Sequence, residues 1–252
     1  MEDLKDILFL DCETTGLPPK NEKWDEDFND FPHIVQLSWS INGKECDFIV
    51  YPDTWEIPEE TVAIHGITME RALREGLPFP FVLKEFIEDC LTAKLIIGHN
   101  IYFDISTIKA SILRYASMGK TWYDEEKCEE ALWKGKRIDT MRKTMRFVGA
   151  CAENSKRLKY PKLEELYDRL FPGETFPAHN SLEDVRAVVR CVPELVKLGI
   201  IELKQKEYPE EQKPEDSEQK PEVREHENEV RKHEKQVTGK SKNRDLLGET
   251  EF

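Results

Sequence analysis

Two spacings of apolar residues divide this chain. Short apolar runs of strand length lie near residues 6–12, 34–41, 46–51 and 95–98. Apolar residues at helical spacing lie near residues 81–91 and 104–117, and again from Ser181, where Leu182, Val185, Val188, Val189 and Val192 share one face. The pattern therefore predicts strands in the first set of segments and helices in the second.

The connections between these segments predict the fold class. Asn42-Gly43 separates the second and third runs and is typical of a β-hairpin turn. A turn-rich stretch with Pro52, Pro58 and Gly66 follows, and helices and strands then alternate. Residues 138–140, Ile-Asp-Thr, have the pattern of another short strand end that runs into a helix. We expect an α/β sandwich whose sheet combines an antiparallel meander with parallel strands.

The apolar pattern stops near residue 203. Residues 203–252 hold 11 Lys and Arg against 14 Asp and Glu, with almost no apolar residues before Leu246. Such a segment cannot bury a core, so we expect a folded domain at 1–202 and a charged, disordered tail at 203–252. Leu246, Leu247 and Phe252 are the apolar residues through which this tail can bind a polymerase or replisome partner; an inert solubilising tail is the alternative.

Composition and charge exclude several classes of protein. Hydrophobic residues make up 38% and charged residues 35%, and no stretch approaches the roughly 18 apolar residues of a membrane span. The acidic segment at 1–6 is unlike a signal peptide, which predicts a cytoplasmic protein with no membrane contact. The cysteines occur singly, so neither a disulfide framework nor a zinc site is indicated. The net charge of −14 requires any nucleic-acid contact to be local.

The first candidate for chemistry is a pair of acids at the end of the first strand. Asp11 and Glu13 follow an apolar run at 7–10, and strand alternation puts both carboxylates on one face. Two like charges held close together at the end of a buried strand repel each other and resist desolvation. The pair therefore indicates either a protonated carboxyl or a cation bound between the two.

Three further polar residues stand where strands end or helices begin. Asp104 follows the apolar run at 95–98, and His179 precedes Asp184 by five residues. Each has a simpler interpretation: Asp104 as a solvated first-turn acid, Asp184 as the capping-box partner of an N-cap Ser181, and His179 as a surface or packing residue. Together with the acid pair, however, they lie where an α/β sheet gathers its ligands.

The combined set predicts a metal site for phosphoryl chemistry. Four carboxylates can hold two divalent cations about 3.5 to 4 Å apart, as in-line phosphoryl displacement requires. Hard oxygen ligands favour two Mg²⁺ or Mn²⁺ ions over zinc. His179 has an intrinsic pKa suited to deprotonating water.

The motifs resemble those of a known family. Residues 9–17 resemble the first motif of the DnaQ-like, DEDDh group of 3′-5′ exonucleases, residues 98–104 the second, and residues 179–184 the third in its histidine form. Residues 62–68 and 138–140 also resemble segments that lie between these motifs in the family. The resemblance implies an RNase H-like fold, with a mixed five-stranded sheet flanked by helices on both faces.

The resemblance also implies a role for each residue of the set. Asp11, Glu13 and Asp184 would hold the catalytic metal, Asp11 and Asp104 the second metal, and His179 would be the general base. The residues that would contact the terminal nucleotide are Thr14, Thr15, Gly16, Leu17, Glu60, His65 and Asn100. Alternatively, Gly16 only turns the chain and His65 only caps a loop. Cys12 departs from the common pattern, but we expect its side chain to point away from the metals.

Two surface segments can affect access of the substrate. The acidic loop at 18–32 is long for a connection between strands and can narrow the site, or it is an ordinary surface loop. A basic stretch can follow the phosphates, or it is a solvated helical face; its members are Lys134, Lys136, Arg137, Arg142, Lys143, Arg146, Lys156, Arg157, Lys159 and Lys162.

The sequence therefore predicts a metal-dependent 3′-5′ exonuclease that binds a single-stranded 3′ end of DNA, RNA or both and releases nucleoside 5′-monophosphates. One alternative is a non-catalytic exonuclease-fold subunit that binds a polymerase or replisome partner through its tail. The other is a structure-specific endonuclease on the same fold. The intact acidic set disfavours the first, and the five-residue spacing of His179 and Asp184 disfavours the second.

Overall fold

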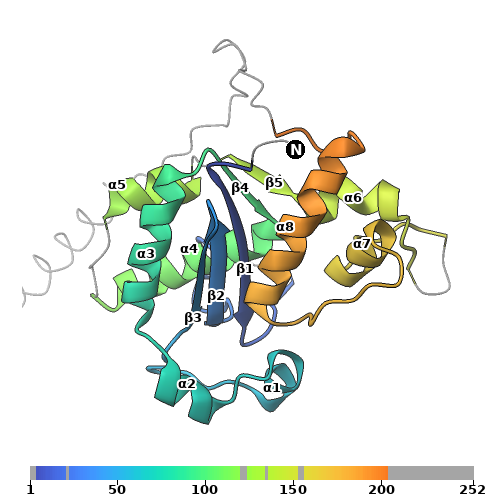
Figure 1. The fold of residues 1–252 in the computed structure, drawn as a ribbon. Coiled ribbons are helices and arrows are strands. Elements are labelled where there is room, and N and C mark those ends of the chain that lie inside the picture. Colours follow the sequence, from blue (N-terminus) through green and yellow to red (C-terminus); the bar gives the residue numbers. More distant parts are fainter. Residues whose placement is uncertain (1–3, 21–22, 120–123, 134–135, 153–155, 204–252) are drawn as a thin grey trace, which may run out of the picture. The chain divides into compact units, whose positions relative to one another are not determined.

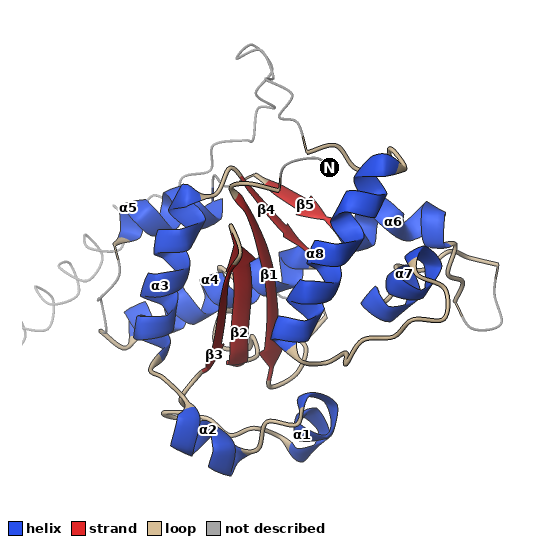
Figure 2. Cartoon of the chain, viewed as in Figure 1, coloured by secondary structure: helices blue, strands red, loops and turns tan. Residues whose placement is uncertain are grey.

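A computed structural model describes residues 4–20, 23–119, 124–133, 136–152 and 156–203 of the protein. Its sheet has five strands in the order β3-β2-β1-β4-β5 (Figures 1 and 2). The strands are β1 (Ile7–Thr14), β2 (Ile34–Ile41), β3 (Lys44–Ile49), β4 (Leu95–Gly98) and β5 (Arg137–Asp139). β1, β2 and β3 pair antiparallel, whereas β1, β4 and β5 run parallel. The predicted mixed sheet is confirmed.

Helices cover both faces of this sheet. They are α1 (Glu59–His65), α2 (Met69–Glu75), α3 (Phe79–Thr92), α4 (Ile101–Ser117), α5 (Glu125–Cys128), α6 (Thr140–Val148), α7 (Leu163–Leu170) and α8 (Ser181–Lys197), with a π-helical turn at Glu129–Trp133. The turn-rich stretch predicted around residue 58 contains α1, and α2 follows it. Neither helix is long enough for a strong periodic signal, which explains why the pattern missed them. Figure 1 shows both helices beyond the C-terminal end of β1.

The alternation along β1 separates two cores. Leu8 and Leu10 belong to the core that contains residues of α3 and α4, while Ile7 and Phe9 belong to the core that contains residues of α7 and α8. Continuing this alternation, Asp11 and Glu13 share the α8 face, and Cys12 lies on the α4 face. The sequence of β1 therefore fixes which layer each functional side chain meets.

The β2–β3 connection is the predicted tight turn. Asn42 and Gly43 both have positive φ, 51° and 80°, which a type I′ hairpin turn requires of its two central residues. The strand after the turn begins at Lys44 and ends at Ile49, two residues earlier at each end than the pattern predicted.

The long acidic loop after β1 is anchored to α4. Arg114 is buried and donates hydrogen bonds to the carbonyl oxygens of Phe28 and Phe31, at 2.7 and 2.6 Å. At the base of the loop, Thr15 N–H donates to His33 O and His33 N–H donates to Thr15 Oγ1, both at 2.9 Å. The parts of the loop that the structure describes are thus held by specific bonds, unlike those of a loosely attached surface excursion.

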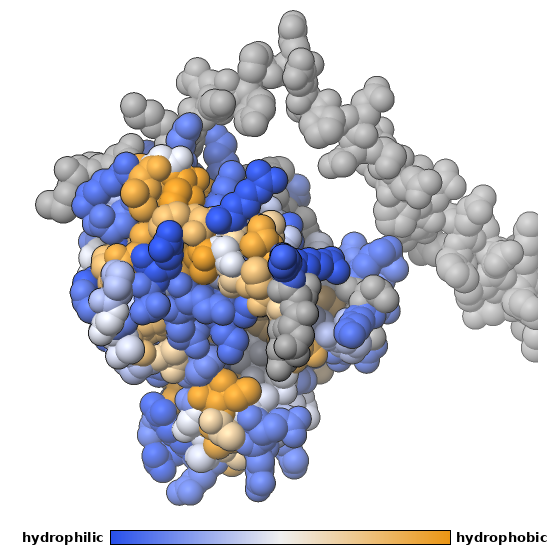
Figure 3. Space-filling model, turned by 90° about the vertical axis from the view of Figure 1, so that its right-hand side faces the viewer, coloured by the Kyte–Doolittle hydropathy of each residue, from blue (hydrophilic) through white to orange (hydrophobic). Residues whose placement is uncertain are grey.

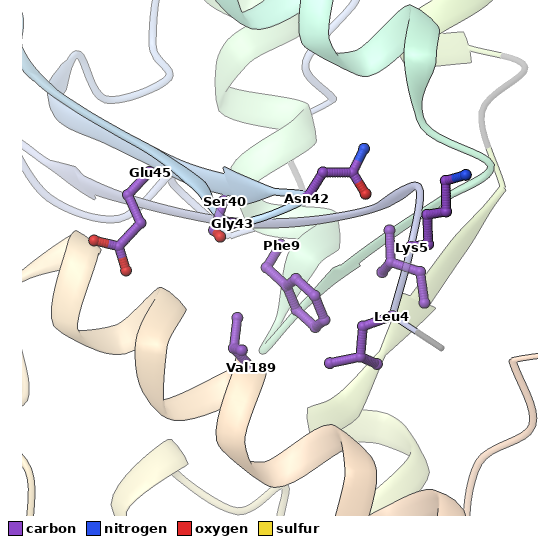
Figure 4. Close-up of a pocket in the computed structure, with 9 residues that line it drawn as sticks. Leu4, Lys5, Phe9, Ser40, Asn42, Gly43, Glu45 and Val189 are labelled. Atoms are coloured by element: carbon purple, nitrogen blue, oxygen red, sulfur yellow. The ribbon is translucent and has the colours of Figure 1, made fainter. Parts of the chain in front are cut away.

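A cavity of about 730 Å³ lies at the N-terminal half of β1, and neither Asp11 nor Glu13 lines it (Figure 4). Leu4, Ile7 and Phe9 line it together with Val189 of α8.

The face seen in Figure 3 is largely hydrophilic, and polar residues separate its apolar patches. None of the helices in the described ranges is long and apolar enough to cross a membrane.

Candidate active site

Three carboxylates meet at the C-terminal end of β1. Asp11 and Glu13 come from β1 and Asp184 from the first turns of α8, and each offers an oxygen within 4.8 Å of the others. The pairing of β1 with β2 becomes irregular between Glu13 and Thr14, as occurs where a strand bends near a site. The structure thus brings together three of the four acids that the sequence singled out.

Hydrogen bonds to β1 and β2 set the position of α8. Ser181 Oγ donates to Asp11 O at 3.1 Å, and Ser181 N–H donates to the Gln36 side chain at 3.3 Å. Asn180, rather than Ser181, is the N-cap, since its side chain accepts from Glu183 N–H. The capping-box interpretation of Ser181 and Asp184 is therefore wrong, because the Ser181 hydroxyl joins α8 to the strand that carries Asp11.

Asp104 lies on the other side of β1. It is only 2% exposed, so it is not a solvated first-turn acid. Its Oδ1 accepts from Cys12 N–H and lies 3.1 Å from Cys12 Sγ. The Cys12 side chain points away from the Asp11 face, as expected, and on the opposite face it meets Asp104, the fourth acid.

Burial and mutual repulsion perturb the acids strongly. Burial is the main cause that raises the pKa of Asp11 well above its usual value, and Asp104, Asp184 and Glu13 add to the effect. Burial and the Glu13 charge raise the pKa of Asp184 to about 8. Burial raises the pKa of Asp104 to about 7, against the bonds from Cys12. A positive charge among these groups would favour their ionised forms and so offset both the effect of burial and the mutual repulsion.

The donor set fits a hard divalent cation. Within the described residues, carboxylate oxygens of Asp11, Glu13 and Asp184 can converge on one ion, and oxygen ligands of this kind suit Mg²⁺ or Mn²⁺. Asp104 is not in this convergent group; its charge still acts on Asp11. The electrostatics and the ligand chemistry therefore point to divalent metal binding.

His179 stands beside the acids with a strained backbone. Its φ is 66°, and its N–H donates to Asp184 Oδ2 at 3.2 Å. The ring is half exposed, with Nε2 3.6 Å from Glu164 Oε1. Burial raises the pKa of Glu13, and the imidazole, when protonated, opposes that effect. A non-glycine residue in the left-handed region costs about 1 kcal/mol or more. Glu164, a partner that the sequence did not reveal, comes from α7.

The predicted pocket residues at 14–17 lie at the end of β1 and directly after it. Thr14 is buried and its hydroxyl donates to Gly16 O at 2.7 Å, while Thr15 bonds to His33 as described above. Gly16 has a φ of 150° and an open space where a Cβ would project. Leu17 is 83% exposed, far more than an apolar side chain usually is without a ligand or partner to contact.

The remaining predicted contacts lie on α1 and at the start of α4. Glu60 is exposed on α1, and His65 ends that helix with Nδ1 accepting from Ile67 N–H. His65 thus does cap a loop, while its Nε2 is buried and has no partner among the described residues. Asn100 precedes α4 with a φ of 70°, and its N–H donates to Asp139 Oδ1 at 3.0 Å. Their contacts with a nucleotide stay predictions.

A hydrogen-bond network that the sequence did not reveal joins the second motif to α6 and α7. His99 Nδ1 lies 3.1 Å from Thr140 Oγ1, and His99 Nε2 donates to Pro161 O at 2.9 Å. Asp139 caps α6 and also accepts from Asn100 N–H. The resemblance of residues 138–140 to a family segment was the one signal for this network.

The basic stretch is not a single surface. Lys134 lies outside the described residues. Arg137 is half-buried and its guanidinium donates to Leu132 O, so it does not face solvent as a phosphate ligand would. Arg142, Lys143 and Arg146 are exposed on α6, and Lys159 pairs with Glu165.

Comparisons with known proteins agree with this geometry. A family model described as exonuclease (RNase T) matches residues 8–192. The chain belongs to this exonuclease family. The family is DnaQ-like and has the RNase H-like fold, as the motifs predicted. No curated protein matches this exonuclease.

Solved structures share the fold of this exonuclease. Exonuclease I from E. coli, in complex with a 5cy-dT13 oligonucleotide, is 19% identical with a TM-score of 0.54, over 76% of this chain and 40% of that chain. Exonuclease I from Methylocaldum szegediense is 20% identical with a TM-score of 0.51, over 75% and 40%. The chain therefore spans less than half the length of these proteins, and the likeness concerns the fold alone.

Proposed function

We propose that this protein is a metal-dependent 3′-5′ exonuclease that shortens single-stranded nucleic acid and releases nucleoside 5′-monophosphates. The convergence of Asp11, Glu13 and Asp184 within 4.8 Å, with His179 beside them, carries the proposal. Membership of the exonuclease family supports nuclease chemistry. The direction, the substrate and the number of metals are the parts that we add.

Each acid has a distinct part in the proposal. Asp11, Glu13 and Asp184 would hold one Mg²⁺ or Mn²⁺, and Asp11 and Asp104 a second. Bound there, the two ions would activate a water and stabilise the leaving oxygen. The protein keeps these carboxylates in place before the substrate arrives, since β1, α4 and α8 are all packed in the two cores.

His179 is proposed as the general base. Its exposed ring can approach a water at the acid cluster, and the bond from its own N–H to Asp184 fixes the backbone beside that cluster. Glu164 Oε1 lies 3.6 Å from Nε2 and can stabilise the positive charge that the ring acquires when it receives a proton. The ring thus has both access to the site and a partner that stabilises its protonated form.

The 3′-terminal nucleotide is proposed to lie between the β1 end and α1. Thr14, Thr15 and Gly16 would face its sugar, and the exposed Leu17 would press on its base. Glu60, His65 and Asn100 would complete the pocket. Within the whole chain, we propose that residues 1–202 are the exonuclease domain. The tail at 203–252 would bind a polymerase or replisome partner; apart from Leu203, it lies outside the described residues.

The test is a time course on single-stranded DNA and RNA of matched sequence, labelled at either the 3′ or the 5′ end. Each is incubated with Mg²⁺, Mn²⁺ or EDTA, and wild type is compared with Asp11→Asn and His179→Ala. We expect stepwise loss from the 3′ end with metal only. Asp11→Asn should be inactive, and His179→Ala should lose about 10²- to 10⁴-fold in turnover, the usual contribution of a general base.

Asp168→Asn is the matched control, because this exposed acid of α7 lies outside the proposed site. It should keep wild-type activity. Shortening from the 5′ end, or cleavage in EDTA, would overturn the proposal. Binding of nucleic acid without cleavage in either metal would instead favour the non-catalytic subunit, and the ratio of the DNA and RNA rates names the substrate.

A further inference from the structure

Two exposed tyrosines flank one arginine near the β5 edge of the sheet. The Arg142 guanidinium carbon lies 4.5 Å from the centre of the Tyr102 ring and 6.0 Å from that of Tyr160. Tyr102 is 48% exposed and Tyr160 51%. Among the described residues, three aromatic residues are at least 48% exposed, and these are two of them. We call Tyr102, Arg142 and Tyr160 the tyrosine platform.

An ion pair and two hydrogen bonds tie the platform to neighbouring segments. Arg142 Nε lies 3.4 Å from Asp139 Oδ2, and Asp139 in turn accepts from the N–H of Asn100, two residues before Tyr102. Tyr160 is followed by Pro161, whose carbonyl accepts from the partly buried His99. Arg142 and the backbone beside both tyrosines are therefore tied to the second motif, which reduces the ordering that a stacking ligand would require.

The same elements connect the platform to the proposed catalytic residues. Tyr102 stands two residues before Asp104 on α4, and because one residue turns a helix by about 100°, Tyr102 faces outward while Asp104 faces β1. The chain after Tyr160 enters α7, where Glu164 meets the ring of His179. The platform and the proposed catalytic residues thus share α4 and the segment that enters α7.

The charge of this region suits nucleic acid. Arg142, Lys143 and Arg146 are all exposed on α6, in a chain with a net charge of −14. Half-exposed aromatic rings beside a guanidinium are elements on which single-stranded bases can stack without regard to sequence. A buried core role would require the rings to be covered, and about half of each is not.

We propose that the tyrosine platform binds a base of the single strand on the 5′ side of the bond that is cut, with the basic face of α6 along its phosphates. This inference rests on the proposed function. It adds a site that grips the strand upstream of the terminal nucleotide and predicts that affinity increases with substrate length.

The test compares thymidine octanucleotide with thymidine dinucleotide in wild type, Tyr102→Ala and Tyr160→Ala. In each variant, we expect KM for the octanucleotide to rise about five- to tenfold, as the loss of one base stack requires. KM for the dinucleotide should rise by much less. Tyr102→Phe and Tyr160→Phe should keep the wild-type ratio of the two KM values, because the ring and not the hydroxyl makes the stack.

Phe81→Ala is the matched control, since Phe81 is similarly exposed but packs on Phe48 at the opposite edge of the sheet. Equal KM ratios in wild type and both alanine variants would overturn the platform. Equal increases in KM for the intact octanucleotide and for one that lacks its internal bases would also overturn it, because the surface would then bind only the phosphates.

Binding of the octanucleotide in EDTA, followed by fluorescence anisotropy, separates this inference from the proposed function. If wild type cuts neither substrate, the proposed function fails, and a weaker affinity of the alanine variants still supports the platform. If wild type shortens the octanucleotide and the variants bind it as tightly, the platform alone is refuted.

Discussion

The clustered acids make the stability of the metal-free protein depend on pH. The pKa of Asp184 is about 8 in the fold against 3.8 for an ordinary Asp side chain. Above pH 4 the unfolded chain loses this proton while the folded chain keeps it. The free energy of unfolding is therefore unaffected by this group below pH 4 and falls as the pH rises toward 8.

The size of the effect follows from this shift. Retaining one proton changes the free energy of unfolding by about 1.4 kcal/mol per pH unit, or about 4 kcal/mol between pH 5 and pH 8. Asp184 keeps partial contact with solvent, which screens its charge, so we expect about 2 kcal/mol. For a folded unit of this size, that is a fall in Tm of about 4 to 8 °C.

Urea and thermal unfolding at pH 5 and pH 8, in EDTA and in excess Mg²⁺, would measure this pH dependence of the free energy of unfolding. Asp184→Asn should flatten the pH dependence and raise the metal-free stability at pH 8, and Asp168→Asn should change neither. Because protons and the cation compete for the same carboxylates, Mg²⁺ should stabilise wild type more at pH 8 than at pH 5. An unchanged slope in Asp184→Asn, or equal stabilisation by Mg²⁺ at both pH values, would refute the reasoning.

Three other substitutions test separate parts of the structure. In Gly98→Ala, the added Cβ would lie 2.9 Å from Leu10 O, so thermal unfolding should show a loss of about 1 to 3 kcal/mol, and an increase in Tm would contradict this close approach. Arg114→Lys cannot keep both bonds to the acidic loop and should cost about 1 to 3 kcal/mol and speed proteolysis after Lys20 or Lys23; wild-type cleavage rates would show that the loop is held by other contacts. Leu17→Ala should raise KM for oligonucleotides about tenfold without a change in Tm, since the side chain is exposed in the free protein, and an unchanged KM would remove it from the proposed pocket.

The fold and most of the acidic cluster were predictable because they depend on local patterns. Alternation along β1 puts Asp11 and Glu13 on one face whatever lies around them. The Asn42-Gly43 dipeptide encodes its turn in two residues. The short helices α1 and α2 were missed, because a helix of two turns has too few positions for its apolar spacing to stand out from a loop.

Other features arise only from contacts between distant segments. No local pattern shows that Cys12 meets the carboxylate of Asp104, 92 residues later, or that His99 holds Pro161, 62 residues later. The pairing of Arg142 with Tyr102 and Tyr160 is equally invisible along the chain. The sequence by itself thus determined which residues carry charge and which face of a strand they take, since strand geometry follows from the backbone. Tertiary structure decided which of them meet, how far burial shifts their pKa values, and where aromatic faces stay open to a ligand, because these depend on how separate elements pack.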